Sequence, residues 1–379
     1  MSKRKEREDG RDWRGKNKTD RGGNRPSSSK GSQQSDAWAE RLNPASMQKG
    51  SGVGYTMSMA IPSSFLNSAQ TRELKTYLVS QIARAAVLHE VDEIVVFIDT
   101  AAEAASDDAD RTPSMFLCRL LQYLECPAYL RKAFFPVHGD LALAGIMPQL
   151  DTPHHMRREN VSMFREGVVV EDKVASDGCY ANVGLQREAY IPMRIRPGTR
   201  VTVKIDDPEL IPEAASSGDS SFQISGTPVA PNTPRAKYGM YWGYKVRMAK
   251  SLHEIFTNCP FKKDGGYDFM IGQSDRGKSI DEVNVKELSV KREADIGPTD
   301  ASARKHVLVV FGGGGGNTIE SCVDADETLP IHGKDADTLF DLWVNSCPQL
   351  GSKQVRTEEA VMIGLTALRP VVLSATAPK

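Results

Sequence analysis

The sequence has few cysteines and no closely spaced cysteine pair. The six cysteines of the 379-residue chain are Cys118, Cys126, Cys179, Cys259, Cys322 and Cys347. Structural zinc sites usually take two cysteines separated by two to four residues, a spacing that is missing here. Proteins of oxidising compartments often depend on a framework of disulfides, and the wide spacing of these six cysteines does not suggest one. The pattern therefore argues against a zinc site and favours a reduced, intracellular compartment.

An excess of charge of one sign and long apolar runs are missing too. Lysine and arginine number 48 against 49 acidic residues, for a net charge of -1. Any nucleic-acid-binding surface must therefore be local. We find no signal peptide and no apolar run close to the ~20 residues that a membrane-spanning helix needs, and so expect no membrane association. With 40% hydrophobic residues, the chain can form one large or two modest domains.

Residues 1–50 have the composition of a disordered tail. Basic residues outnumber acidic ones there, and glycine, serine and asparagine supply almost nothing to bury. One interpretation is a nuclear or nucleolar address with a loose RNA contact, because spaced lysines and arginines can neutralise phosphates. The other is a solubilising tail.

The folded part begins with a strand, a helix and a second strand. Residues 55–61 form an apolar strand, residues 69–89 have helical spacing, and residues 93–99 are typical of a fully buried strand. This order predicts a βαβ unit of a parallel sheet. Residues 114–126 are a further helix. The helix over 69–89 should bury the positions Leu74, Leu78, Ile82 and Ala86.

The pattern changes near Phe164, where short strands alternate with glycine, proline and aspartate turns. This spacing predicts a small antiparallel barrel or sandwich over residues 161–237. Residues 209–232 are expected to form a long surface loop. Basic residues spaced along the strands suggest an RNA cradle, against the alternative of solvated strand faces: Arg187, Arg194, Arg196, Arg200 and Lys204.

Two pairs of ring residues lie before this change. Phe134 and Phe135 are expected to be core residues rather than base-stacking groups. His154 and His155 are not at metal-ligand spacing from other ligands, and we expect no metal site there. A hinge that contacts RNA backbone is the favoured interpretation of the histidine pair.

The last third contains three strands followed by polar loops. Residues 268–277 form a strand that ends in a loop with Asp275 and Arg276, and residues 306–311 form a buried strand followed by Gly312 and Gly313. The two glycines let backbone approach a ligand closely, but no P-loop motif follows. Residues 342–344 form a strand whose loop leads to a helix from Thr357, its N-cap, to Leu368. This last segment suits an adenine ring, although an ordinary strand-loop-helix connection is the alternative.

Seven motifs resemble, in order, those of the SPOUT-domain RNA methyltransferases, in their eukaryotic and archaeal class. They are YTMSMAIP at residue 55, LQYLECPAYLRKAFFP at 121, DTPHHMR at 151, YWGYKVRMAKSL at 241, IGQSDRG at 271, LVVFGG at 308 and VNSCPQLGSKQVRTEEA at 344. The resemblance covers about residues 54–373. It implies a trefoil-knotted α/β SPOUT domain with a parallel sheet, formed by residues 51–160 and 238–379, into which residues 161–237 insert an OB-like β domain.

The resemblance also implies S-adenosylmethionine as cofactor and a site formed by three loops. The implied catalytic residues are Arg276, to neutralise charge on a uracil carbonyl, and Asp275, as a base. The implied cofactor-binding residues are Arg276, Gly312, Gly313, Asn345, Ser346, Cys347, Gly351, Ser352 and Val355. A glycine run that continues to Gly316 departs from the family pattern and affects the placement of Glu320.

The implied reaction is methyl transfer to large-subunit ribosomal RNA, at uridine N3, by a nuclear and nucleolar protein of ribosome biogenesis. The implied partners are the pre-60S particle and a second subunit, either a copy of the chain or a paralogue. An alternative is an inactive RNA-binding assembly factor of the same fold, which the longer glycine run and Leu350 favour. For a role at the mitotic spindle the sequence offers no feature.

Overall fold

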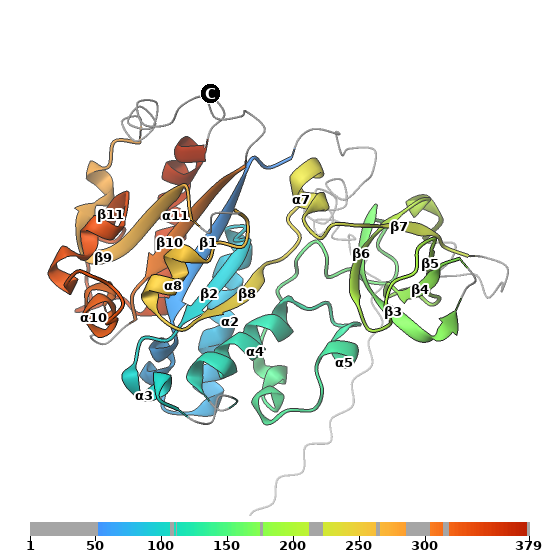
Figure 1. Cartoon of the computed structure of the whole chain (residues 1–379), viewed down its shortest axis with the longest axis horizontal. Helices are drawn as coiled ribbons and strands as arrows, with labels where there is room; N and C mark the ends of the chain where they lie inside the picture. Colours follow the sequence, from blue (N-terminus) through green and yellow to red (C-terminus); the bar gives the residue numbers. More distant parts are fainter. Residues whose placement is uncertain are drawn as a thin grey trace, which may run out of the picture. The chain divides into compact units, whose positions relative to one another are not determined.

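The computed structural model describes residues 52–106, 110, 112–174, 177–211, 223–262, 266–285, 304–313 and 318–376. The predicted tail, residues 1–50, lies outside these residues. All of the described residues belong to one compact unit, Leu42–Lys379. They form two β-sheets, one parallel and one antiparallel (Figure 1).

The parallel sheet has six strands in the order β11-β9-β10-β1-β2-β8. Its strands are β1 (Tyr55–Pro62), β2 (Glu93–Phe97), β8 (Lys245–Ala249), β9 (Phe269–Ser279), β10 (Lys305–Phe311) and β11 (Leu342–Asn345). Every neighbouring pair is parallel. The central strands β1, β2 and β10 are buried along almost their whole length, as expected for strands covered on both faces. The predicted α/β class with a parallel sheet is confirmed.

Helices cover both faces of this sheet (Figure 1). Alternate residues of β1 point to opposite sides: Met57 and Met59 join one core cluster, and Ala60 joins the other. The first cluster contains side chains of α2 (Arg72–Leu88), α4 (Pro113–Glu125) and α11 (Thr357–Thr376). The second contains side chains of α8 (Leu252–Thr257) and α10 (Ile319–Ala325). Two single-turn helices, α3 (Ala101–Ala104) and α5 (Arg131–Phe134), flank α4 in sequence.

The helix α2 differs from its prediction in which face it buries. It begins at Arg72, after Thr71 caps it by accepting a hydrogen bond from Leu74 N. Leu74 was predicted to be a core position, but its side chain is 53% exposed. The buried stripe begins at Thr76 and Val79, because the first turn faces solvent. Ile82 and Ala86 are buried as predicted.

The C-terminal helix α11 is longer than predicted. It continues past Leu368 and through Pro370 to Thr376. Thr357 is its first helical residue rather than the N-cap. The amide of the preceding residue, Arg356, is bonded to the Glu359 carboxylate at 3.0 Å.

By length and composition, α11 could also cross a membrane, contrary to the expectation that no apolar run approaches that length. Its residues Val361, Leu365 and Leu368 are instead buried in the core, and the helix packs against α2 and β10. This is the environment of a core helix in a folded domain.

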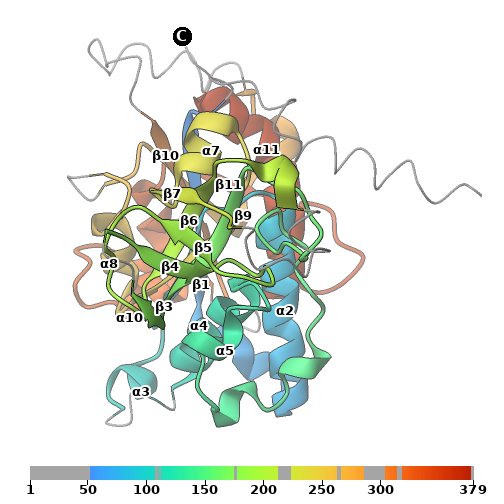
Figure 2. The ribbon, with the colours of Figure 1, turned by 90° about the vertical axis from the view of Figure 1, so that its right-hand side faces the viewer.

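The antiparallel sheet has the order β5-β4-β3-β6-β7. Its strands are β3 (Phe164–Val174), β4 (Cys179–Asn182), β5 (Ala189–Ile191), β6 (Arg200–Ile205) and β7 (Gly226–Val229) (Figure 2). A bridge between Tyr190 and Ser225 joins the two ends and nearly closes the sheet into a barrel. The change of pattern at Phe164 is therefore confirmed, whereas the expected loop over 209–232 was wrong in part, because it contains β7.

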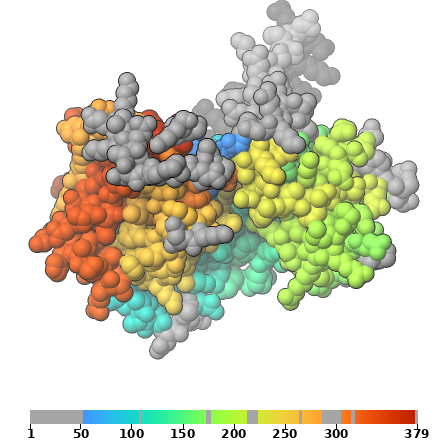
Figure 3. All heavy atoms as spheres, turned by 45° about the horizontal axis from the view of Figure 1, so that its top comes forward, coloured from blue at the N-terminus to red at the C-terminus, as the bar shows by residue number. Residues whose placement is uncertain are grey.

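The chain leaves the antiparallel sheet through α7 (Thr233–Tyr238) and enters the edge strand β8. In the space-filling view, this yellow stretch lies between the green strands and the orange C-terminal third (Figure 3). The strand β8 begins at Lys245, and the helix α8 that follows is capped by Ser251, whose side chain accepts a hydrogen bond from Glu254 N.

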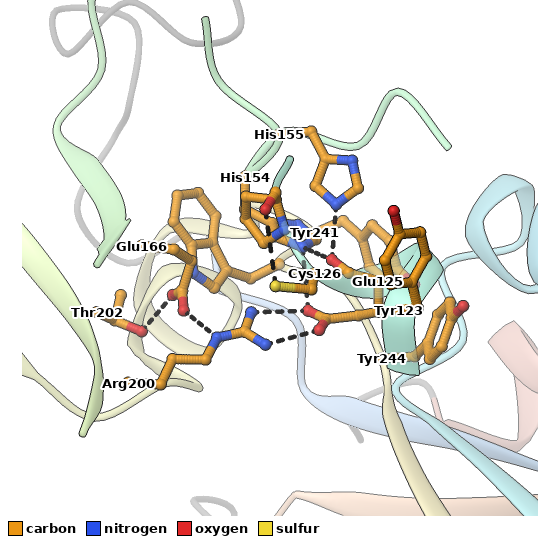
Figure 4. A network of polar contacts seen from close by, with 12 residues as sticks. Tyr123, Glu125, Cys126, His154, His155, Glu166, Arg200, Thr202, Tyr241 and Tyr244 are labelled. Atoms are coloured by element: carbon orange, nitrogen blue, oxygen red, sulfur yellow. Dashed lines mark hydrogen bonds and ion pairs between the residues drawn. The ribbon is translucent and has the colours of Figure 1, made fainter. Parts of the chain in front are cut away.

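A buried ionic network links the antiparallel sheet to the end of α4 (Figure 4). The Arg200 guanidinium donates to both Glu125 oxygens, at 2.7 and 2.9 Å, and to Glu166 at 2.7 Å. Burial alone would raise the pKa of Glu125, but the hydrogen bond with His154 and the charge of Arg200 hold that pKa at about 2. Arg200 is therefore a structural residue, which corrects its place in the predicted RNA cradle.

The two histidines also have a structural role. His154 is fully buried, and its Nε2 lies 2.9 Å from the Glu125 carbonyl oxygen, while Nε2 of His155 lies 2.6 Å from the same atom (Figure 4). Burial and the neighbouring His154 lower the pKa of His155 to about 3. The predicted RNA contact was wrong for the His154 ring, because it is fully buried, whereas for the half-buried His155 it stays a prediction.

We expect His155→Gln to make stability less sensitive to acid. Below pH 6.5 the unfolded chain protonates this histidine, but the folded chain does not until about pH 3. The wild-type protein therefore loses stability as pH falls, by about 1–2 kcal/mol between pH 7 and 5. Urea unfolding at both pH values should show a smaller loss for the variant.

His253→Gln, at an exposed position, is the matched control and should behave as wild type. The raised pKa of Asp92, about 6, acts in the opposite sense in all three proteins and cancels from the comparison. An equal loss of stability in wild type and His155→Gln would contradict the assignment.

Candidate functional site

The carboxyl ends of β9, β10 and β11 bring three segments of the last third together. The three strands are adjacent and parallel, so the residues that follow them meet at one edge of the sheet. Ligands of open α/β sheets bind at this edge. The Asn345 side-chain amide donates to the Asp275 carbonyl oxygen at 3.0 Å, and the Thr357 hydroxyl lies 3.5 Å from the Gly312 carbonyl oxygen. The predicted convergence of the three loops is therefore observed.

A jump in register shapes the first of these segments. Trp343 of β11 pairs with Gly272 of β9, but the next residue, Val344, pairs with Lys278. Between these two consecutive pairings, β9 therefore has five additional residues, 273–277, that do not pair with β11. We call them the displaced segment. A Cβ atom on Gly277 would lie 2.4 Å from the Val344 carbonyl carbon, so only glycine fits where β11 passes.

Hydrogen bonds fix the displaced segment against its neighbours. The Ser274 hydroxyl donates to Glu320 Oε1 at 2.7 Å and accepts from the Arg276 amide at 3.2 Å. After β11, the Cys347 amide donates to the Asn345 side-chain oxygen at 2.9 Å. The backbone around Arg276 and Asn345 is thus held by side chains from three separate segments.

Three polar atoms at this edge are buried without a hydrogen-bond partner among the described residues. They are Gln273 Oε1, Glu320 Oε2 and Ser346 Oγ. A buried polar atom without a partner costs about 1–3 kcal/mol, and most such atoms are satisfied. Each of these three oxygens could accept a hydrogen bond from a polar ligand, and the Ser346 hydroxyl could also donate one.

The predicted catalytic pair lies on the solvent side of the displaced segment. Asp275 and Arg276 are both exposed. Asp275 Oδ1 accepts a long hydrogen bond of 3.4 Å from the Ser274 hydroxyl. Within the part of the chain that the structure describes, the Arg276 guanidinium has no ion-pair partner. Both side chains are free to meet a large substrate from solution.

The predicted cofactor-binding residues fall into two groups. Gly312, Gly313, Asn345, Ser346 and Cys347 are buried or half-buried at the ends of β10 and β11. Gly351 and Ser352 are exposed in the loop that leads to α11, whereas Val355 is half-buried. The glycine run beyond Gly313, residues 314–317, lies outside the described residues.

Two polar residues of the site were missing from the predicted set. Glu320 lies in the first turn of α10, which Thr318 caps, and Gln273 is the first displaced residue of β9. Glu320 is 7% exposed despite its charge. The sequence does show a carboxylate, Glu320, just after the N-cap of a helix, and this could have marked it as a candidate. Its hydrogen-bond partner, Ser274, is 46 residues away, so the sequence could not show that the two side chains meet.

A cleft lies at the opposite, amino edge of the parallel sheet. This cleft has a volume of about 1700 Å³ and is bordered by the starts of three strands, at Thr56, Lys245 and His306. No residue of the three-loop site lines it. The cleft and the three-loop site are therefore separate features of the molecule.

The sequence profile of the family described as "Putative RNA methyltransferase" matches residues 56–368. The chain belongs to this RNA methyltransferase family. It is 43% identical over 327 residues to the mouse 28S rRNA (uridine-N(3))-methyltransferase, with 84% of this chain and 77% of the mouse protein covered. The human protein of the same name is 40% identical, over 89% of this chain and 84% of its own length. The Drosophila melanogaster protein is 41% identical, with 83% and 62% covered.

We expect Gly277→Ala to destabilise the protein by about 1–3 kcal/mol, because the new methyl group must displace the β11 backbone. Guanidinium unfolding followed by circular dichroism measures this loss. Gly351→Ala is the matched control, since a Cβ there meets nothing within 4 Å and stability should not change. Equal stability of the two variants would show that β11 does not constrain this position.

Proposed function

We propose that the protein is an S-adenosylmethionine-dependent methyltransferase that modifies N3 of a uridine in large-subunit ribosomal RNA. The observation that carries the proposal is the set of three partnerless buried polar atoms at the carboxyl edge, in a member of an RNA methyltransferase family. The names of the mouse, human and Drosophila relatives supply the substrate and the atom.

The residues at this edge fit the proposed cofactor. Asn345, Cys347 and Gly351 offer backbone groups for an adenine and a ribose, and Leu342 and Val355 offer apolar contacts. The Glu320 carboxylate oxygen that lacks a partner suits a cationic amino group. S-adenosylmethionine, when bound, supplies an electrophilic methyl group. The protein mainly has to align the acceptor with it, and such alignment contributes about 7–11 kcal/mol in well-oriented reactions.

The uridine acceptor must lose its N3 proton, since the imino group is protonated at neutral pH. Asp275 is the proposed base, and its carboxylate receives that proton. The Arg276 guanidinium stabilises the negative charge that develops on the uracil carbonyl oxygens. Both side chains belong to the displaced segment and are exposed. A uracil base that has turned out of its stack in the RNA could therefore reach them.

The proposed fold is a trefoil-knotted SPOUT domain formed by residues 51–160 and 238–379, with an OB-like domain inserted at 161–237. The close passage of β11 at Gly277 and the nearly closed antiparallel sheet support it. We further propose that the protein acts on pre-60S particles in the nucleus and nucleolus, as a dimer with a copy of itself or a paralogue. The nuclear address would lie in residues 1–50, outside the described residues.

The alternative of an inactive assembly factor has two supports. One is Leu350, which is 43% exposed. The other support, the longer glycine run, lies outside the described residues.

The purified protein should transfer a methyl group from S-adenosylmethionine to protein-free large-subunit ribosomal RNA, with 3-methyluridine as the product detected by mass spectrometry. Arg276→Ala should lower the rate at saturating donor by about 100-fold or more, as the loss of one oxyanion-stabilising group does elsewhere. Arg369→Ala, at an exposed position of α11, is the control and should keep the wild-type rate.

Two results would count against the proposal. Wild-type protein that binds the donor but makes no 3-methyluridine would favour the assembly-factor alternative. Arg276→Ala at the wild-type rate would remove Arg276 from the mechanism.

A further inference from the structure

The cleft at the amino edge of the parallel sheet has walls from both sheets. Its lining includes Asp92, Lys245 and His306 from the starts of parallel strands, and Arg200 and Thr202 from β6 of the antiparallel sheet. Its volume of about 1700 Å³ exceeds the roughly 300–1,000 Å³ of most small-molecule pockets. The size suits a segment of a polymer better than a single small ligand.

The charges in this cleft do not cancel. Each of its four carboxylates is paired with a cation of the same wall: Asp92 with Arg235, Glu125 and Glu166 with Arg200, and Asp268 with Lys262. Lys245 and Arg304 also line the cleft, and neither has an ion-pair partner among the described residues. The cleft therefore carries an excess of positive charge.

Arg304 itself needs an acceptor. Its Nη2 atom is buried and makes no hydrogen bond to any described residue. Burial lowers its pKa, and the field of Asp92 opposes this effect. A guanidinium that is partly removed from water and lacks an acceptor matches the oxygens of a phosphate group.

Aromatic rings lie among these cations. Phe134 and Phe135, at the end of α5, pack in part against a core cluster as expected, but they are only half-buried and also line the cleft. Phe261 also lines it, stacked on His306 with ring centroids 5.6 Å apart. Cations beside accessible aromatic rings are how proteins bind unpaired nucleic acid, with phosphates on the cations and bases on the rings.

The cleft and the proposed methyl-transfer site lie at opposite ends of the same strands. Six residue steps along β10 separate His306 from Gly312, a span of about 20 Å at ~3.3 Å per residue. A base in the cleft is therefore not the base that is methylated. An RNA substrate could reach both places only through separate nucleotides.

We propose that this cleft binds a single-stranded segment of the RNA substrate that flanks the target uridine. Lys245 and Arg304 contact its phosphates, and Phe134 and Phe135 stack on its bases. The proposal rests on RNA being the substrate, but not on the identity of the methylated nucleotide. It gives the protein a second RNA contact, remote from the proposed chemistry.

Fluorescence anisotropy with a labelled 12-nucleotide oligouridylate and the full chain tests the proposal. The double variant Lys245→Ala/Arg304→Ala should bind about tenfold more weakly or worse. The slope of log K against log salt should become shallower by about 1.4, because each contact to a single-strand phosphate contributes about 0.7. Lys245→Ala alone, at an exposed position where folding is not at risk, should remove about half of that slope.

Lys250→Ala is the matched control, since it lies just past the other end of β8, is exposed and does not line the cleft. It should bind as wild type. Wild-type affinity and salt slope in the double variant would overturn the proposal. Absence of oligouridylate binding by the folded wild-type protein would overturn it too, and a peptide-like occupant would then be the one to seek.

A parallel methylation assay separates this proposal from the proposed function. If wild type methylates ribosomal RNA and the cleft variants bind RNA normally, only the cleft proposal fails. If oligouridylate binding depends on Lys245 and Arg304 but no 3-methyluridine forms, the cleft stands and the proposed activity fails.

Discussion

The passage of β11 beside β9 at Gly277 is the contact on which the proposed site depends. The Val344 backbone occupies the place where a side chain on residue 277 would lie. This closeness accompanies the jump in register that leaves residues 273–277 of β9 without a pairing to β11. The displacement exposes Asp275 and Arg276, while Ser274 turns inward to Glu320. The close contact at Gly277 thus accounts for a segment in which Asp275 and Arg276 face solvent while Ser274 bonds to a buried carboxylate.

The same parallel sheet presents two different edges. The carboxyl edge combines displaced backbone with buried polar atoms that have no hydrogen-bond partner among the described residues, as a site for a small polar ligand would. The amino edge has a large cleft with half-buried rings and one more cation than carboxylates, as a site for a polymer would. The Glu125–Arg200–Glu166 network fixes the antiparallel sheet to the end of α4 and so shapes the second edge. Together the two edges suit an enzyme that grips a long substrate away from its reacting atom.

The features that sequence could predict are those with local causes. Continuous apolar runs predicted β1, β2 and β10, and the alternation after Phe164 predicted the antiparallel sheet. The grouping of Arg276, Gly312 and Asn345 came from the ordered motifs of a known family, because no local pattern specifies which strands are neighbours. The end of α11 was missed because tertiary packing carries the helix through Pro370.

Features that depend on distant partners were beyond prediction. Arg200 was read as an RNA contact because its two carboxylates lie 34 and 75 residues away in the chain. The buried position of His154 was missed for the same reason, since its partner, the Glu125 carbonyl oxygen, is 29 residues away. Phe134 and Phe135 have core composition, and only the fold shows that they border a cleft.

Amide hydrogen exchange with and without S-adenosylmethionine tests the central claim most directly. If the displaced segment and its neighbours form the donor site, added donor should slow exchange at residues 273–277, 312–313 and 345–355. Exchange at Lys245 and His306, on the amino edge, should stay unchanged. Protection at the amino edge instead, or no protection in a folded protein at millimolar donor, would contradict the claim.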